Sequence, residues 1–533
     1  ETHGASWIDL RSRYHQGLAL TGDVRGNGVR PSAAEIEGVL VPWLRALARS
    51  DDEDIRTTAL MAWARIVEGE AAVPLIETVL EYLHDEKGPW RDVIVFALGI
   101  PRHARGVEPL ASLVRDLPAG RELIDLRSVP DRMRATAALA LGQLGGEAAA
   151  AALLEALESE TTEDVRACCW LAAGASVREL SDETRARVVR LATKRLDEEK
   201  VPAAEAAALP AALALAGDPI VVPVLRSRLA RFADPMSARA ACVLAILHLA
   251  PRLDEQLADV LIATARRDPD QSARRYALVT LGDLALRTST ASDMSEDDLG
   301  VIGGKLMSFW RGVFGGRNVQ RWDESWASLG AGRFAAAFPE HREETIRALR
   351  KRAVDRTEKE RESAAVLALA IAGDQDSLPL LRKILDGAND VYLRSWSTLG
   401  LGALGGPEDR AALEELAFHH ASEVVRYRAI QGLVCIPDPA LVPRLIEAMR
   451  TSTSDMVESA VARAIGEIGD RRALRPLMEV ASDESVGRSA RRRAISALAL
   501  LAEPRSEPWV RTYQRVLDAN RSTPALDILL RIY

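Results

Sequence analysis

Reactive and cross-linking side chains are scarce in this sequence. It has four cysteines in 533 residues, and their spacing matches neither a zinc site nor a dense disulfide framework. The four are Cys168, Cys169, Cys242 and Cys435. Because free cysteine is among the residues most often buried, we expect all four to be small core residues.

Long apolar runs are also missing. The longest nearly uncharged apolar stretch, residues 206–217, is interrupted by Pro210 and is shorter than the roughly 18 residues that a spanning helix requires. Aromatic residues make up only 5% of the chain, whereas hydrophobic residues make up 48% and charged residues 27%. This composition excludes a disordered chain and predicts a folded, soluble protein without a transmembrane segment.

Neither sign of charge dominates. The 77 acidic and 69 basic residues give a net charge of -8, which argues against a general polyanion binder and disfavours nucleic acid as a partner, although a local basic patch remains compatible. Only seven of the basic residues are lysine and 62 are arginine. Arginine and the abundant alanine are strong helix formers, so this skew favours an all-α chain.

Motifs of familiar catalytic chemistry do not occur. The sequence has no His-Glu-x-x-His, no P-loop, no Gly-x-Ser-x-Gly and no Gly-x-Gly-x-x-Gly that opens a helix after a strand. Adjacent side chains such as His419 and His420 point in different directions, so we expect surface or capping use of this pair rather than metal binding. No catalytic residue, metal or cofactor is therefore expected, and the chain is predicted not to be an enzyme.

A repeat of 32 to 35 residues is present along most of the chain. Its most regular polar feature is a column of arginines, interrupted once by Glu458. The column consists of Arg56, Arg134, Arg166, Arg239, Arg274, Arg361, Arg394, Arg426 and Arg491. Two large gaps in the N-terminal half each hold one divergent unit, near Arg91 and Glu205. The spacing predicts at least twelve units.

Each unit has the pattern of a helix hairpin. A proline opens an apolar helix, as in Val73-Pro74 and Val442-Pro443, where its missing N–H costs little. The arginine follows 14 to 16 residues later in most units, with alanine or leucine at helical spacing after it, and glycine such as Gly469 ends the second helix. Two helices cannot bury their apolar faces alone, so stacking into an all-α solenoid is predicted.

The proline of the first helix and the acidic-Val-Arg-x-x-Ala start of the second resemble HEAT repeats, especially the short bacterial form shared with bilin-lyase repeat proteins. Residues 164–169 and 423–429 are clear copies. The resemblance covers roughly residues 31–500 and implies a superhelix of stacked hairpins, which is a fold and not an activity. None of the eight histidines is followed by Glu, so the His-Glu pairs of the di-iron HEAT-repeat hydroxylases are missing.

The repeat pattern divides the chain into four parts. They are an N-terminal cap or linker (1–30), N-terminal HEAT-like repeats (31–287), a divergent Trp- and Gly-rich insertion (288–335), and C-terminal HEAT-like repeats with a cap (336–533). A second departure, residues 118–130, is predicted to be a loop added between the helices of one unit. In HEAT repeats the arginine usually bonds an acidic residue or a carbonyl of its own or the adjacent unit, and we expect the same of this column rather than a polyanion groove.

The insertion holds the best candidate for a functional site. Between Lys305 and Trp322 there is no acidic residue, and basic side chains alternate with aromatic ones among glycines. Such a segment suits a protein hot spot, a stacked base or a membrane surface, while the alternative is a divergent unit whose aromatics fill the core. The candidate partner-binding residues are Lys305, Phe309, Trp310, Arg311, Phe314, Arg317, Arg321, Trp322 and Trp326.

Three function classes remain open from the sequence. The leading one is a non-catalytic scaffold or adaptor that binds a protein partner, as a subunit of a larger complex. The alternatives are a bilin-lyase-like or chaperone-like helper, and a nucleic-acid binder like the HEAT-like DNA glycosylases. If Glu1 is a processed N-terminus the protein would be periplasmic or secreted, and otherwise cytoplasmic.

Overall fold

The predicted all-α solenoid is confirmed. The computed structural model describes residues 29–85, 90–178, 180, 182–198, 200–230, 236–355, 358–387 and 390–503. In these residues the secondary structure is helical, without a strand, and successive helices form antiparallel hairpins. The described residues hold thirteen hairpins, which agrees with the prediction of at least twelve units.

The chain divides into two compact units. One contains residues 33–250 with Glu503, and the other contains residues 251–502 with the short segment 29–32. The limits at residues 30, 287 and 335 come from the repeat pattern and stay predictions. We refer below to unit 33–250 and unit 251–502.

Unit 33–250 has six hairpins. Their first helices are α3 (Val41–Leu47, preceded by α2, Ala33–Glu35, and the π-turn Ile36–Leu40), α5 (Val73–Asp85), α7 (Val107–Val114), α10 (Glu147–Ser159), α12 (Asp182–Asp197) and α14 (Val222–Ala230). Their second helices are α4 (Glu53–Ile66), α6 (Arg91–Ala97), α9 (Asp131–Leu144), α11 (Glu163–Ser176), α13 (Ala203–Ala216) and α15 (Met236–Leu249). An additional helix, α8 (Pro118–Leu123), lies between α7 and α9.

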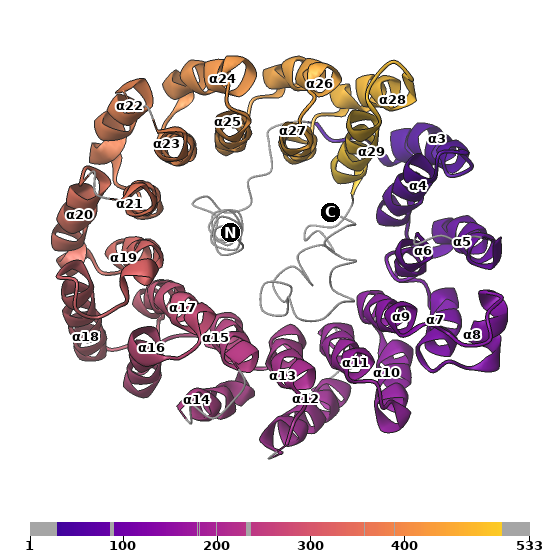
Figure 1. Ribbon diagram of the computed structural model, residues 1–533, viewed down its shortest axis with the longest axis horizontal. Coiled ribbons are helices and arrows are strands. Elements are labelled where there is room, and N and C mark those ends of the chain that lie inside the picture. The colour runs from indigo at the N-terminus through magenta and orange to yellow at the C-terminus, as the bar shows by residue number, and fades with distance from the viewer. Residues whose placement is uncertain are drawn as a thin grey trace. The chain divides into compact units, whose positions relative to one another are not determined.

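Unit 251–502 has seven hairpins. Its first helices are α16 (Glu255–Arg267), α18 (Glu296–Phe314), α20 (Pro339–Ala353), α22 (Leu378–Gly387), α24 (Arg410–His419), α26 (Val442–Thr451) and α28 (Leu474–Ser482). Its second helices are α17 (Gln271–Ser289), α19 (Glu324–Ala337), α21 (Lys359–Ile371), α23 (Val391–Leu404), α25 (Glu423–Cys435), α27 (Asp455–Ile468) and α29 (Arg488–Ala502). Figure 1 shows α19, α21, α23, α25 and α27 on the inner side of this unit's arc and the first helices on its outer side.

Local sequence signals explain where the helices begin and end. Pro443 lies in the first turn of α26, where a missing N–H leaves no hydrogen bond unmade. Asp390 caps α23 by accepting a hydrogen bond of 2.7 Å from the backbone N–H of Leu393. Gly469 ends α27 with φ of 71°, a left-handed conformation that glycine adopts without strain.

Second helices pack against one another at very short range because glycine lies at their crossings. A Cβ atom on Gly402 of α23 would lie 2.3 Å from the Cα atom of Gly432 on α25. In unit 33–250, a Cβ atom on Gly174 of α11 would lie 2.1 Å from the carbonyl oxygen of Ala212 on α13. The backbones of neighbouring second helices therefore touch, which no larger residue would allow.

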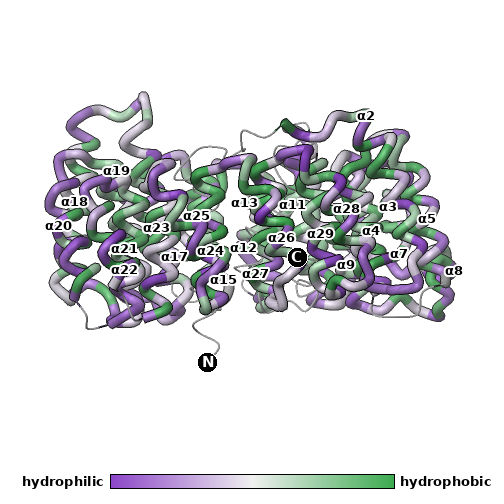
Figure 2. Tube along the Cα trace, turned by 90° about the horizontal axis from the view of Figure 1, so that it is seen from above, coloured by the Kyte–Doolittle hydropathy of each residue, from purple (hydrophilic) through white to green (hydrophobic). Residues whose placement is uncertain are grey.

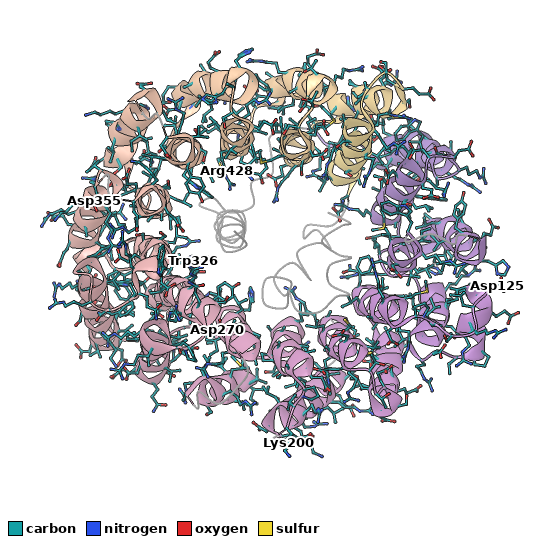
Figure 3. All side chains as sticks on the ribbon, viewed as in Figure 1. Asp125, Lys200, Asp270, Trp326, Asp355 and Arg428 are labelled. Atoms are coloured by element: carbon teal, nitrogen blue, oxygen red, sulfur yellow. The ribbon has the colours of Figure 1, made fainter. Side chains whose placement is uncertain are left out.

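The second helices carry most of the core. Residues Glu362 to Ile371 of α21 are all buried, and they pack with apolar residues of α20, α22 and α23. Figure 2 shows green, apolar segments running through the helices of the stack, interrupted by purple, polar segments. On α25, the guanidinium of the buried Arg428 lies 4.1 Å from the ring centre of Trp396, and Figure 3 shows Arg428 and Trp326 on second helices. Burial of both faces explains why these helices are rich in alanine and glycine.

Ion pairs connect the first helices of unit 251–502 from repeat to repeat. Nε of Arg382 on α22 donates 2.8 Å to Asp409, which directly precedes α24. Nη1 of Arg410 on α24 then donates 2.7 Å to Asp438, ahead of α26. Long side chains therefore connect the first helices, whereas glycine lets the second helices touch.

Two segments that depart from the repeat pattern contain helices, and one of them was expected to be a loop. Residues 118–130 are not a plain loop, because they begin with helix α8. Asp116 holds this segment by accepting hydrogen bonds from Arg121 (2.9 and 2.8 Å) and from the backbone N–H of Val129 (2.7 Å). Residues 288–335 likewise form regular helices, since α18 and α19 make a hairpin of the stack despite the glycines that interrupt the pattern.

Candidate functional site

The candidate residues between 305 and 326 lie on α18, on the start of α19 and on the connection between them. A short 3₁₀ turn, Arg321–Asp323, leads into α19. The structure divides the nine residues into a buried aromatic group, a set of paired cations and a small exposed group. These groups have different consequences for binding.

The buried group consists of Phe309, Trp310 and Trp326, each no more than 1% exposed. The ring centres of Phe309 and Trp310 lie 4.8 Å apart, and Trp310 lies 6.4 Å from Phe334 of α19. These three side chains belong to the core, where the ring centres of Trp326 and Tyr276 of α17 lie 6.1 Å apart, as the alternative interpretation of the segment describes. In the folded repeat they offer no surface to a partner.

Three of the four cations in the segment are paired with carboxylates of adjacent hairpins. Nζ of Lys305 donates 2.9 Å to Asp259 on α16, and this hydrogen bond raises the pKa of Lys305. Arg311 makes a bidentate pair of 2.8 and 2.7 Å with Glu344 on α20, which lowers the pKa of that carboxyl. These pairs remove most of the local excess of positive charge that the sequence suggested.

Arg321 is the third paired cation. Its Nε donates 2.8 Å to Glu358, which precedes α21. The side chain of Arg321 is nevertheless 65% exposed, so the pair lies in water and contributes little to stability.

Trp322 is the most exposed aromatic residue of the described chain, with 67% of its surface accessible. Arg317, five residues earlier on the same connection, is exposed, and its side chain makes no hydrogen bond or ion pair with any described residue. Phe314 is half-buried, with the guanidinium of Arg352 lying 4.8 Å from its ring centre. Of the nine predicted residues, Trp322 and Arg317 form the part that is free to bind.

The backbone at Trp322 is held by α17. Asp323 is fully buried and accepts hydrogen bonds from Nε of Arg274 (2.7 Å) and Nε of Arg275 (2.9 Å). Nη2 of Arg275 also donates 3.2 Å to the carbonyl oxygen of Trp322. The indole is thus presented on a fixed turn, which reduces the entropy lost on binding.

Sequence reasoning missed Asp323 and Arg275. The arginine column identified Arg274, and an acidic residue just before the next second helix is the signal that could have identified Asp323. No sequence signal separates Arg275 from the exposed arginines around it.

The arginines of the column bond within the chain. Those that pair with carboxylates of a following hairpin are Arg134 with Glu160, Arg166 with Glu205, and Arg274 with Asp323. Arg361 pairs backwards, with Glu324 (2.8 Å), and Arg394 contacts Nε2 of His420 (3.0 Å). Carbonyl oxygens accept from Arg56 (Ser50, 2.8 Å), Arg239 (Leu229, 2.9 Å) and Arg491 (Ala481, 3.0 Å). Arg426 is the one arginine of the column whose side chain has no hydrogen-bond or ion-pair partner among the described residues.

Two buried glutamates take the place of arginine in the column. Glu205 accepts hydrogen bonds from Arg166 and Arg195 and, at 3.1 Å, from the indole N–H of Trp170. Burial opposes the charge of Glu205, but the bonds from the two arginines outweigh it and its pKa is lowered. Glu458 is 3% exposed, lacks such an arginine pair, and burial raises its pKa.

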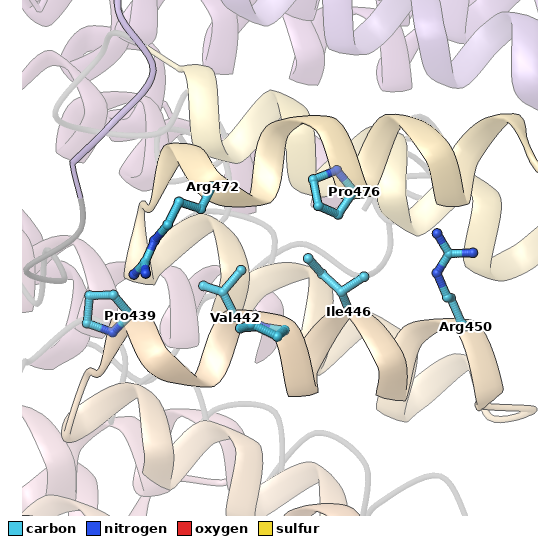
Figure 4. Close-up of a pocket in the computed structure, with 7 residues that line it drawn as sticks. Pro439, Val442, Ile446, Arg450, Arg472 and Pro476 are labelled. Carbon is cyan, nitrogen blue, oxygen red and sulfur yellow. The ribbon is translucent and has the colours of Figure 1, made fainter.

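A shallow apolar hollow of about 270 Å³ lies between α26 and α28 (Figure 4). Its lining residues are Pro439, Val442, Pro443, Ile446, Arg450, Arg472 and Pro476. Arg450 is paired with Glu479 and Asp483 of the following hairpin, and Arg472 is paired with the neighbouring Asp470. The hollow therefore offers no free polar group to orient a ligand.

Side chains with reactive or metal-binding chemistry also lie outside the candidate segment. Burial raises the pKa values of Cys169 and Cys435 to about 12, so these thiols stay protonated near neutral pH. No group of three or more His, Cys, Asp or Glu in the described ranges could hold a metal ion. Among the described helices, none has both the length and the apolar character to cross a membrane.

Comparison with known families identifies the repeat. Residues 346–433 and 410–499 match the model for HEAT repeats, and residues 133–159 match the model for the PBS lyase HEAT-like repeat. A search of curated proteins found no match. The matched segments lie in both units and consist of the hairpins described above.

Proposed function

We propose that this chain, which is a HEAT-repeat protein, is a non-catalytic scaffold that binds a protein partner within a larger complex. Trp322 carries the proposal, because a large apolar side chain that is 67% exposed on a fixed turn is what a binding hot spot requires. Arg317 and Arg321 are exposed on the same connection between α18 and α19, and the side chain of Arg317 has no partner among the described residues.

The rest of the molecule supports a binding role. Stacked hairpins provide a long surface on which each repeat adds contacts, and the side-chain networks of the second helices make that surface stiff. The hollow between α26 and α28 is lined mainly by apolar side chains, and burial raises the pKa of the Cys169 thiol to about 12. A non-catalytic role fits these observations best.

The test places a photo-crosslinking amino acid at position 322 of the full chain, expressed in its source cells. The matched control carries the same amino acid at position 220, since Ile220 is 72% exposed and lies in unit 33–250. We expect a particle heavier than the 57.9 kDa chain and a stoichiometric crosslink from position 322 but not from position 220. A lone 57.9 kDa species without a crosslinked protein would overturn the scaffold proposal.

A further inference from the structure

We propose that the partner presents an acidic segment, which binds along one edge of unit 251–502 with Trp322 as its apolar anchor. This inference rests on the proposed function and names the chemistry of the partner. The edge is the one at which first helices end and second helices begin. We call it the basic edge and define it by Arg267, Arg317, Lys351 and Trp322.

The three cations occupy corresponding places in consecutive hairpins. Arg267 is the last residue of α16, Arg317 follows the end of α18, and Lys351 lies in the last turn of α20. All three are exposed, and none makes a side-chain hydrogen bond or ion pair with a described residue. Positive charge is thus repeated along the edge without a carboxylate partner among the described residues.

The carboxylates of the same edge are mostly engaged. Asp268, Asp270 and Asp323 are buried beneath the starts of the second helices, where they accept hydrogen bonds from the chain. Glu358 is paired with Arg321, and only Glu360 is exposed and unpaired among the described residues here. The accessible surface of the edge is therefore basic although the whole chain has a net charge of -8.

Cations at helix C-termini also stabilise the helix dipole, and this accounts for part of the pattern. It does not account for Trp322, whose indole is exposed to water on the connection between α18 and α19 at the same edge. Apolar and cationic groups side by side complement a peptide with apolar and acidic residues. The charge of the remaining surface opposes a long polyanion such as nucleic acid.

The geometry sets the spacing of the expected segment. Adjacent helices stack about 10 Å apart, and an extended peptide advances about 3.3 Å per residue. Neighbouring cations on the basic edge therefore match acidic residues about three apart, with an apolar or aromatic residue between them for Trp322. A segment of roughly seven residues would span the three hairpins.

The experiment selects peptides from a random display library against the full chain and measures their affinity by fluorescence anisotropy. Variants are Trp322→Ala and Arg317→Glu, and the matched charge-reversal control is Arg475→Glu on α28, which is also exposed and without a partner among the described residues. We expect enriched peptides to be acidic with a central apolar residue. Trp322→Ala should weaken their binding about 30-fold and Arg317→Glu about 10-fold, with no change for Arg475→Glu.

Three results would overturn the inference. Enriched peptides would lack acidic residues, or their affinity would not depend on Trp322, or a 20-nucleotide single-stranded DNA would bind more tightly than any peptide through the same residues. If position 322 crosslinks to a partner through a segment without acidic residues, the scaffold function stands and this inference fails. If no partner exists, both fail.

Discussion

Arg166 of α11 and Glu205 of α13 join two neighbouring second helices through a hydrogen bond of 3.0 Å from Nε to Oε1. Arg195 of α12 donates to the same carboxylate from the first helix of that hairpin. One buried anion thus holds three helices of unit 33–250. Its loss would remove one acceptor from each of two guanidiniums and the acceptor of the Trp170 indole N–H.

Replacement of Glu205 by alanine should therefore destabilise the chain by about 3–5 kcal/mol. Urea unfolding followed by circular dichroism measures this change. The control is Glu158→Gln on α10, where an exposed carboxylate without a described partner should change stability by less than about 0.5 kcal/mol. Equal effects of the two variants would contradict the role given to Glu205.

Glu205 also gives a pH dependence of known sign. Its folded pKa is lowered, so its contribution is complete above the unfolded pKa of about 4.3 and is lost as pH falls through the folded value. We expect the stability difference between the parent chain and Glu205→Gln to shrink as pH falls below about 4. A difference that stays constant from pH 7 to pH 3 would contradict this account.

Glu458 should behave in the opposite way. Burial raises its folded pKa, so the charged form weakens the fold at neutral pH. Glu458→Gln should stabilise the chain on the order of 1 kcal/mol at pH 7 and have no effect below about pH 4, where the carboxyl is protonated in both states. Thermal unfolding at both pH values tests this, and destabilisation at pH 7 would show that the carboxylate is paired.

Gly402 allows a close contact between the second helices α23 and α25. Gly402→Ala should destabilise unit 251–502 by about 1–3 kcal/mol, because the new Cβ atom has no room against Gly432. Gly304→Ala on α18 is the matched control. Nothing lies within 4 Å of its added Cβ atom, so alanine should stabilise this helix by about 0.5–1 kcal/mol. Urea unfolding of both variants distinguishes packing from helix propensity.

The cysteines should be unreactive in the native chain. Cys168, Cys169 and Cys242 are buried, and the pKa of the half-buried Cys435 is raised to about 12. We expect a thiol reagent at pH 7.5 to label none of the four within minutes, and all four after unfolding in guanidinium. Rapid labelling of the native chain would mean that these helices open readily.

The hairpins were predictable from the sequence because their signals are local. Proline at the start of α26, Asp390 before α23 and Gly469 after α27 each act through neighbouring backbone groups. The repeat period then fixed which helices stack.

The site was predictable only in part, because exposure depends on how helices rotate against their neighbours. Trp310 and Trp322 are similar in sequence context, yet Trp310 faces α19 and Trp322 faces water. The carboxylate partners of Lys305 and Arg311 could not be predicted from the sequence either, since these partners lie 46 and 33 residues away along the chain. A segment that looks basic in sequence can be neutral once neighbouring hairpins add their carboxylates.

The contrast between the two helix layers of unit 251–502 has a mechanical consequence. Glycine brings the second helices together, while the longer arginine–aspartate pairs connect the first helices, so the two layers are joined by side chains of different length. The curvature of this unit therefore depends on the lengths of individual side chains in the two layers. A shorter side chain in place of one of these arginines, or a larger residue in place of one of these glycines, would change the angle between two neighbouring hairpins. The angles between the other hairpins would stay the same.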